Sequence, residues 1–98
     1  MKVAFSKSFQ KAFRKLSGKM QESVANVIRH VKHTEHVDDI PNCKRLIGFE
    51  SVYRIRIGSY RAFFILRIKK DTAFFEYLIS RGEAYSKKTI EQLRKKDK

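Results

Sequence analysis

The chain has 98 residues, with 23 Lys and Arg against 10 Asp and Glu, and a formal net charge of +13. Hydrophobic residues make up 42% of the chain and aromatic residues 12%, which excludes a disordered basic tail. The length excludes a multidomain enzyme and predicts a single domain over residues 1–98. A single cysteine excludes an intramolecular disulfide and a multi-cysteine zinc site.

No apolar run is long enough to span a membrane, and the N-terminus lacks the apolar region of a signal peptide. We therefore expect a cytoplasmic protein without a membrane partner. Basic residues outnumber acidic ones in both halves of the sequence, so the charge belongs to the folded body. Such a surplus predicts a polyanionic partner, either nucleic acid, an acidic protein, or both in turn. A solvated basic surface without a partner is the simpler alternative.

The first half of the sequence predicts a short strand and two helices. Residues 2–5 have strand character, and a helical period begins at Ser8. Ser6 or Ser8 would cap this first helix and Gly18 would end it. The apolar stripes of the two helices are Phe9, Ala12, Phe13 and Leu16, followed by Met20, Val24, Val27, Ile28 and Val31. The two helices should form a helical hairpin.

The second half predicts strands. No period survives over residues 33–45, and Pro41 and Asn42 indicate a loop. Period-2 alternation then predicts three strands, at residues 52–57, 60–68 and 72–80, and a short helix at about residues 86–94. We expect the Lys-rich end, residues 95–98, to fray. The order β-α-α-β-β-β predicts an α+β fold, in which an antiparallel sheet carries the helical hairpin on one face.

The first two strands should pair through a two-residue type II′ turn at Gly58-Ser59. This register places Arg56 directly opposite Arg61. Like charges opposed on a sheet are destabilising, so the pair indicates a bound polyanion, although long arginines can also splay into water. The face that should cover the helices carries Tyr53, Ile55, Ile57, Ala62, Phe64, Leu66, Ile68, Ala73, Phe75, Tyr77 and Ile79. The opposite face, expected to be a basic concave surface, carries Arg54, Arg56, Arg61 and Arg67 with Phe63 and Ile65.

Three segments carry a resemblance to a known family. Residues 52–64, VYRIRIGSYRAFF, resemble the hairpin segment "YRIRvGdYRviY" of the RelE/ParE toxin superfamily. Residues 80–85, SRGEAY, resemble the segment "hRgdvY" that closes the sheet in RelE-like members, and residues 46–48 resemble the L-x-G that precedes the hairpin. The element order also matches, so the resemblance covers nearly the whole chain.

The resemblance implies the toxin of a type II toxin–antitoxin system. RelE-like members are endoribonucleases (mRNA interferases) that bind the ribosomal A site and cleave mRNA there. They use no metal or other cofactor. The ribose 2′-OH attacks the adjacent phosphate and leaves a cyclic phosphate and a 5′-hydroxyl. The resemblance also implies a cognate antitoxin that wraps and blocks the toxin, with operator DNA bound only through that complex.

The same resemblance assigns roles to individual residues. The catalytic candidates are Arg61, which would bind the phosphate, Arg81, which would stabilise the developing charge, and Tyr85, which would stack on the nucleotide and take part in proton transfer. Arg54 and Arg56 would hold the RNA backbone. Planar guanidinium groups suit these roles because they donate two hydrogen bonds to a phosphate. We expect the side chains of Arg61 and Arg81 to be exposed.

The general base is the point at which this sequence departs from the family. The best-known ribonuclease members have lysine at the positions of Arg54 and Arg56, and many relatives have histidine in place of Ser80. Arginine has a pKa above about 12 and is a poor base. Tyr85 is the best remaining candidate. Three glutamates are weaker candidates: Glu50, Glu76 and Glu83.

Other residues have weaker claims to a role. Phe63 lies on the predicted arginine face and would stack on a base, although a core position is more common. Lys11 and Lys15 would contact RNA backbone from the first helix, although a solvated helix face is more common. Cys43 has no partner at a catalytic spacing, and no metal site is expected from the three histidines, His30, His33 and His36.

Two other functions stay open. A ParE-like inhibitor of DNA gyrase is the first, and retention of Arg61, Arg81 and Tyr85 argues against it. The second is a degenerate homologue that binds antitoxin and DNA without catalysis, and the missing base keeps it open.

Overall fold

The computed structural model describes residues 1–97 and contains the predicted succession of strand, two helices, three strands and helix. A 3₁₀ turn and a short strand lie between the second helix and the hairpin. The elements are β1 (Lys2–Phe5), α1 (Lys7–Arg14), α2 (Gly18–Lys32), η1 (Val37–Asp39), β2 (Cys43–Arg45), β3 (Val52–Ile57), β4 (Tyr60–Arg67), β5 (Thr72–Ser80) and α3 (Lys87–Lys96). No helix within this part of the chain is both long and apolar enough to cross a lipid bilayer.

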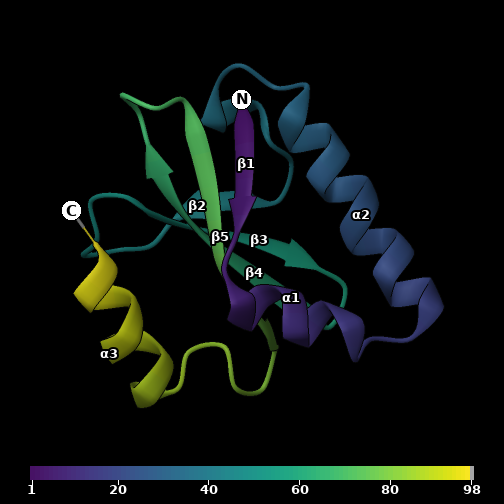
Figure 1. Cartoon of the computed structure of the whole chain (residues 1–98). Coiled ribbons are helices and arrows are strands. Elements are labelled where there is room, and N and C mark those ends of the chain that lie inside the picture. Colours follow the sequence, from purple (N-terminus) through teal and green to yellow (C-terminus); the bar gives the residue numbers. More distant parts are fainter. Residues whose placement is uncertain (98) are drawn as a thin grey trace.

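The strands form one sheet in the order β1-β5-β4-β3-β2 (Figure 1). The predicted α+β fold, with a helical hairpin on one face of an antiparallel sheet, is confirmed in all but one strand pairing. One pairing departs from it, because β1 runs parallel to β5, with Val3 opposite Ala73. Short turns fix the directions of β3, β4 and β5, whereas β1 reaches the sheet from the other end of the chain, and no turn signal fixes its direction.

The β3–β4 hairpin has the predicted register. Arg56 lies opposite Arg61, and Arg54 lies opposite Phe63. Gly58 has a φ of +58°, and Ser59 is not among the residues with positive φ. A positive φ at the first turn position alone is what a type II′ turn requires.

A bulge changes the face to which part of β5 belongs. The β4–β5 register shifts just after Phe63, which lies opposite Tyr77. Leu78 therefore joins the core under the helices, whereas Tyr77 and Ile79 pack on the other side. The predicted placement of Tyr77 and Ile79 on the helix-covered face is wrong, because a one-residue shift exchanges the two faces of a strand.

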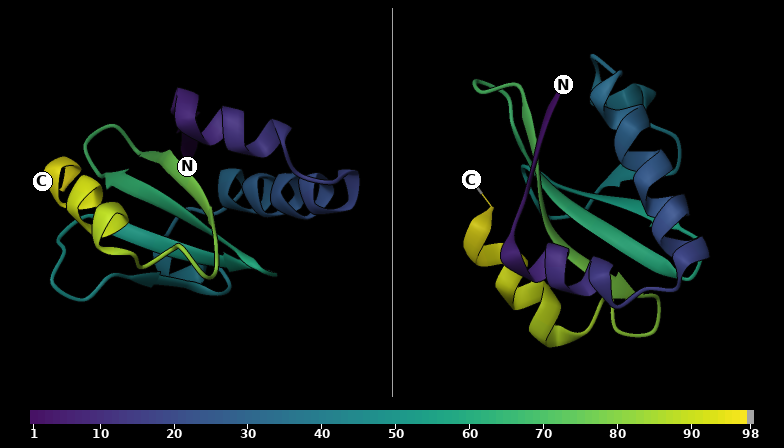
Figure 2. Two further views of the ribbon diagram at one scale, coloured as in Figure 1. Left: turned by 90° about the horizontal axis from the view of Figure 1, so that it is seen from below. Right: turned by 45° about the vertical axis from the view of Figure 1, so that its right-hand side comes forward.

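The helices α1 and α2 cover one face of the sheet (Figure 2). Serine side chains cap both helices: the Ser6 hydroxyl accepts from the Phe9 N–H at 3.0 Å, and Ser17 accepts from Met20 at 3.2 Å. Gly18 begins α2 and does not end α1, because Ser17 caps the second helix at that point. Both predicted stripes pack here, and the buried centre comprises Phe9, Val24, Ile28, Val31, Ile40, Ile55, Ile57, Ala62, Phe64, Ala73, Phe75 and Leu78.

The helix α3 lies against the opposite face of the sheet (Figure 2), where a second core forms. Its buried residues are Phe49, Val52, Phe63, Ile65, Ala84 and Leu93. The sequence predicts a basic concave surface over this face, but α3 shields the apolar side chains of the face from water and confines the basic surface to its margins. Arg67 is half-buried here, and its Nη2 donates to the Lys96 carbonyl at 3.1 Å.

The end of α3 is tied to the loop between β2 and β3. The helix runs to Lys96, and the Asp97 carboxylate accepts hydrogen bonds from the main-chain N–H groups of Glu50 and Ser51 at 2.9 and 2.7 Å. The prediction that this end frays is wrong for residues 95–97, and Lys98 lies outside the described residues.

Two strand boundaries differ from prediction. Residues 43–45 form the edge strand β2, which pairs with β3, although the sequence there predicts no regular structure. Three residues are too few for alternation to be seen, and Asn42, with a φ of +59°, turns the chain into the strand. Ile68 lies beyond the end of β4 and is 81% exposed, so its predicted place on the core face is wrong.

Candidate nucleic-acid interface

A cleft of about 330 Å³ lies between the start of α3 and the β2–β3 loop. Three of its lining residues are cationic, none carries a carboxylate, and the others are apolar or aromatic. The lining residues are Lys44, Arg45, Leu46, Ile47, Phe49, Arg54, Tyr85 and Ile90. The cleft therefore brings two of the predicted site residues, Arg54 and Tyr85, to one place and adds Lys44 and Arg45 to them.

Arg54 occupies the inner wall of this cleft. It lies on β3, directly opposite Lys44 of β2, and its side chain is half-buried. Its Nε is buried and has no hydrogen-bond partner among the described residues. A buried donor without a partner is costly, and the cost is higher when the group is charged. An anion entering the cleft would supply the missing acceptor.

Tyr85 is held by the core behind it. Its side chain is 50% exposed, and its ring meets the Phe63 ring edge-on, with centroids 6.0 Å apart and planes at 87°. Phe63 has no exposed surface. The prediction that Phe63 stacks on a base is therefore wrong. Phe63 fixes the orientation of Tyr85, which is the exposed aromatic ring at this site.

Arg61 is almost fully buried, with 8% of its surface exposed. Its Nη1 donates to the carbonyls of Gly58 at 2.9 Å and Tyr60 at 3.0 Å. The expectation that its side chain is exposed is wrong, because the guanidinium folds back onto the hairpin turn. The Arg61 guanidinium is therefore engaged by the turn carbonyls, although the register places Arg61 opposite Arg56.

Arg81 and Arg56 lie near the same turn and are exposed. The main-chain N–H of Arg81 donates to the Ser59 carbonyl at 2.7 Å. This hydrogen bond does not involve the Arg81 side chain. The Arg56 Nη2 donates to the Asn42 side-chain oxygen at 3.2 Å. The hairpin turn thus has three arginines near it, Arg56, Arg61 and Arg81. None of them lines the cleft beside α3.

The two predicted helix lysines lie elsewhere. Lys11 and Lys15 are exposed on and just after α1, on the face of the sheet opposite to α3 (Figure 2). The structure does not bring them to the cleft. A contact from Lys11 and Lys15 to RNA stays a prediction, and it would have to involve a different face of the molecule.

The weaker base candidates do not line the cleft either. Glu76 forms an ion pair with Lys96, with 3.7 Å between the Oε1 and Nζ atoms, and Glu50 and Glu83 are exposed elsewhere. The residues described by the structure contain no group of three metal-ligating side chains. Burial raises the pKa of the Cys43 thiol to about 12, against the opposing effect of Arg54, so this cysteine is not a ready nucleophile.

Sequence reasoning missed Lys44 and Arg45. Both lie on β2, a strand too short to show a period, so nothing in the pattern placed them beside Arg54. The one available signal is their position immediately before residues 46–48, a segment that already resembled a family motif.

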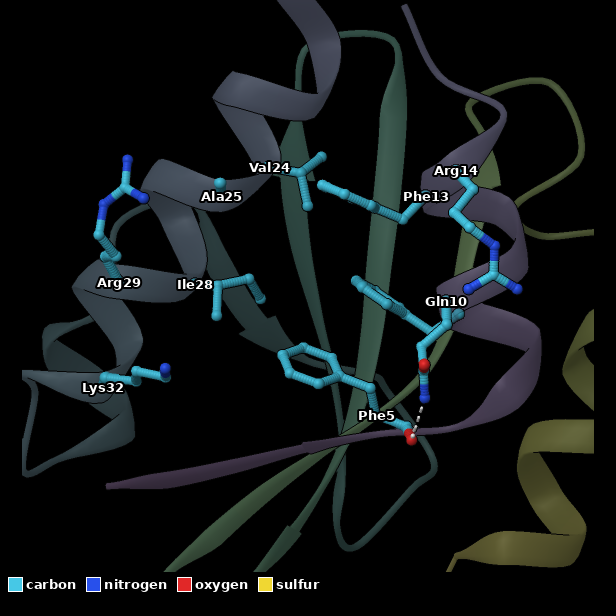
Figure 3. Close-up of a pocket in the computed structure, with 10 residues that line it drawn as sticks. Phe5, Gln10, Phe13, Arg14, Val24, Ala25, Ile28, Arg29 and Lys32 are labelled. Atoms are coloured by element: carbon cyan, nitrogen blue, oxygen red, sulfur yellow. Dashed lines mark hydrogen bonds between the residues drawn. The ribbon is translucent and has the colours of Figure 1, made fainter. Parts of the chain in front are cut away.

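A second hollow lies on the opposite face, between α1 and α2 (Figure 3). It has a volume of about 370 Å³ and an apolar floor that includes Phe5, Phe13 and Ile28. Its rim is basic, with exposed Arg14, Arg29 and Lys32.

Comparison with known proteins places this geometry in context. No protein-family model matches the chain. The toxin RelE3 of Methanocaldococcus jannaschii is 28% identical over 86 residues, which cover 87% of this chain and 96% of that protein. The RelB-RelE antitoxin-toxin complex from Methanococcus jannaschii contains a chain that matches with a TM-score of 0.72 and 24% identity, over 85% of this chain and 95% of that one. The chain therefore has the fold of this toxin, and its sequence is similar to that of RelE3.

A bacterial structure extends the match to the C-terminal helix. A mutant of the E. coli toxin RelE in the free state matches with a TM-score of 0.72 over 97% of this chain and 95% of that one, at 18% identity. The resemblance found in the hairpin and closing segments is thereby confirmed for the fold as a whole.

Proposed function

We propose that this RelE-like protein is the toxin of a toxin–antitoxin pair and an endoribonuclease that cleaves mRNA in the ribosomal A site. The cleft under α3 is the observation that carries the proposal. It joins an unpartnered Arg54 Nε, Lys44 on the adjacent strand and the half-exposed ring of Tyr85. Cations for the phosphates and an aromatic face for the bases are the combination that single-stranded RNA requires.

The reaction is an intramolecular transesterification of one phosphodiester bond in the RNA strand. The ribose 2′-oxygen bonds to phosphorus while the bond to the 5′-oxygen breaks, which leaves a cyclic phosphate and a 5′-hydroxyl. One proton leaves the 2′-OH and one reaches the 5′-oxygen. Arg54 and Lys44 are positioned to neutralise the charge that builds on the phosphate. The chemistry needs no cofactor.

Proton transfer falls to Tyr85 and Lys44. Both line the cleft, whereas the glutamates weighed as bases do not. Arginine cannot exchange a proton readily near neutral pH, so Arg54 serves for binding and charge stabilisation. Arg81 and Arg56, exposed at the hairpin turn, would extend the contact along the RNA backbone.

The partner that would control this activity is an antitoxin. Structures of relatives include RelB-RelE complexes from Methanococcus jannaschii and from Pyrococcus horikoshii OT3, the second with a TM-score of 0.71 and 21% identity. The net charge of +13 supports an acidic partner. We expect the pair to act in the cytoplasm, with operator DNA bound only by the complex.

Induced expression in bacteria without an antitoxin, followed by primer extension on cellular mRNA, tests the function. We expect discrete cuts within translated regions, their loss with Arg54→Ala in the cleft, and weaker cuts with Arg81→Ala at the hairpin turn. Arg29→Ala is the matched control, because it removes an exposed arginine from α2, away from the cleft. Growth arrest with intact mRNA and altered DNA supercoiling would instead identify a gyrase inhibitor. Neither arrest nor cuts would identify a homologue that only binds.

A further inference from the structure

We propose that Ile47 packs against a nucleobase of the bound RNA and, together with Tyr85, determines which base the cleft accepts. The proposal rests on the proposed ribonuclease function and adds a specificity-determining residue to it. Ile47 lines the same cleft as Tyr85, and its side chain is 99% exposed.

The local turn explains why Ile47 projects into solvent. The Phe49 N–H donates to the Leu46 carbonyl at 3.2 Å, and Gly48 has a φ of +85°. Ile47 and Gly48 are therefore the two central residues of a turn in which glycine supplies the positive φ. The side chain of Ile47 contributes nothing to this turn, so folding alone does not require an isoleucine there.

The turn is anchored on both sides. Phe49 is buried, and the Arg94 guanidinium of α3 lies 4.4 Å from the centre of its ring. Arg94 also donates to the Gly48 carbonyl at 3.4 Å, and Asp97 holds the next two N–H groups of the loop. Ile47 is thus presented on a braced turn, and a ligand that packs against it does not have to order the loop first.

The surroundings of Ile47 favour RNA over a protein segment. A single exposed isoleucine is common on protein surfaces and needs no explanation by itself. This one lies at the mouth of a cleft with Lys44, Arg45 and Arg54, and with the exposed ring of Tyr85. An apolar wall and an aromatic wall suit the two faces of a base, and the three cations suit the phosphates beside it.

The test compares mRNA cleavage sites in cells that express the wild type, Ile47→Ser, Ile47→Phe or the control Ile68→Ser. Ile68 is the matched control because it is also exposed, at 81%, but lies at the end of β4 and does not line the cleft. We expect Ile47→Ser to reduce cleavage by about 3- to 10-fold and to flatten the base preference at the cut, because an aliphatic side chain packs on a base less strongly than an aromatic ring does. Ile47→Phe should retain cleavage with an altered preference, and Ile68→Ser should match the wild type.

The outcomes separate this proposal from the function on which it rests. If the wild type cuts mRNA and Ile47→Ser cuts the same sites with the same yield, the role of Ile47 is refuted while the ribonuclease stands. The same holds if Ile47→Ser changes only antitoxin binding, which would make the turn a protein contact. If the wild type makes no cuts, both proposals are refuted.

Discussion

Arg61 and Arg81 both lie beside the β3–β4 turn, but their environments differ, and so do the roles that we assign to them. Arg61 is buried and donates to two main-chain carbonyls, whereas Arg81 is exposed and its main-chain N–H donates to the Ser59 carbonyl. An arginine whose buried guanidinium donates to main-chain carbonyls supports the fold, and one with a solvated guanidinium is available to a ligand.

Alanine substitutions should separate the structural role of Arg61 from the RNA-binding role of Arg81. Arg61→Ala leaves the Gly58 and Tyr60 carbonyls without their donor, which should lower the free energy of unfolding by about 1–3 kcal/mol. Arg81→Ala should change it by less than about 0.5 kcal/mol and still weaken mRNA cleavage. Urea denaturation measures the first effect and primer extension the second. Equal stability of the two variants would contradict the structural role of Arg61.

Substitutions of Phe63 and Tyr85 should likewise separate an effect on stability from an effect on cleavage. Phe63→Ala should cost about 3–5 kcal/mol of stability, because it opens a cavity at a fully buried position. Tyr85→Ala removes a half-exposed ring, so it should cost less stability and yet abolish cleavage. Thermal unfolding and cleavage assays on both variants provide the check. A stable Phe63→Ala protein that has lost only RNA binding would restore the stacking role for Phe63.

At the scale of elements, α3 decides whether the cleft exists. It buries Leu93 against the sheet and is held at its end by Asp97, by Arg94 and by the bond from Arg67 to Lys96. Partial desolvation opposes ionisation of Asp97. The hydrogen bonds from the loop N–H groups and the Ser51 hydroxyl, with Arg94 nearby, outweigh it and hold the pKa of Asp97 below its ordinary value of 3.8. The carboxylate form therefore ties α3 to the β2–β3 loop.

Asp97→Asn tests this tie through its pH dependence. A carboxyl whose pKa is lower in the folded state contributes stability above its unfolded pKa and loses it as the pH falls through the folded pKa. Asp97→Asn should therefore be less stable than the wild type at neutral pH, and the difference should shrink as the pH falls below about 4. Hydrogen exchange of the α3 amides should be faster in the variant at pH 7. A stability difference that is independent of pH would argue against the charged tie.

At the scale of the molecule, the net charge of +13 has no matching set of acidic partners within the chain. The charges of the cleft and of the exposed hairpin arginines lie on the α3 side, and those of Lys11 and Lys15 on the other side. A phosphate backbone that passes the three cations of the cleft and reaches one of the two hairpin arginines would meet about three or four cations.

Binding of single-stranded RNA should therefore depend steeply on salt. With three or four phosphate contacts, log K should fall with log[salt] at a slope of about −2 to −3, a loss of about 15- to 60-fold between about 50 and 200 mM salt. Fluorescence anisotropy with a short RNA measures the slope. The double variant Lys44→Ala, Arg54→Ala should reduce it by more than Lys11→Ala, Lys15→Ala does. Equal reductions would mean that the cleft is not the principal RNA surface.

The sequence by itself determined the local features of this protein. Alternation and the Gly58-Ser59 turn specified the β3–β4 register, and helical periods specified the stripes of α1 and α2, because these signals depend only on neighbouring residues. The motif segments also placed Arg54 and Tyr85 among the site candidates.

Only the tertiary structure decided which of those candidates share a site. The bulge beside Phe63, the parallel pairing of β1 and the short strand β2 arise from contacts between distant segments, which no local period reports. The docking of α3 on the arginine face then buried Phe63 and left Tyr85 half-exposed. The apolar side chains on that face are buried because α3 packs over them. The cleft forms where the start of α3 meets the β2–β3 loop.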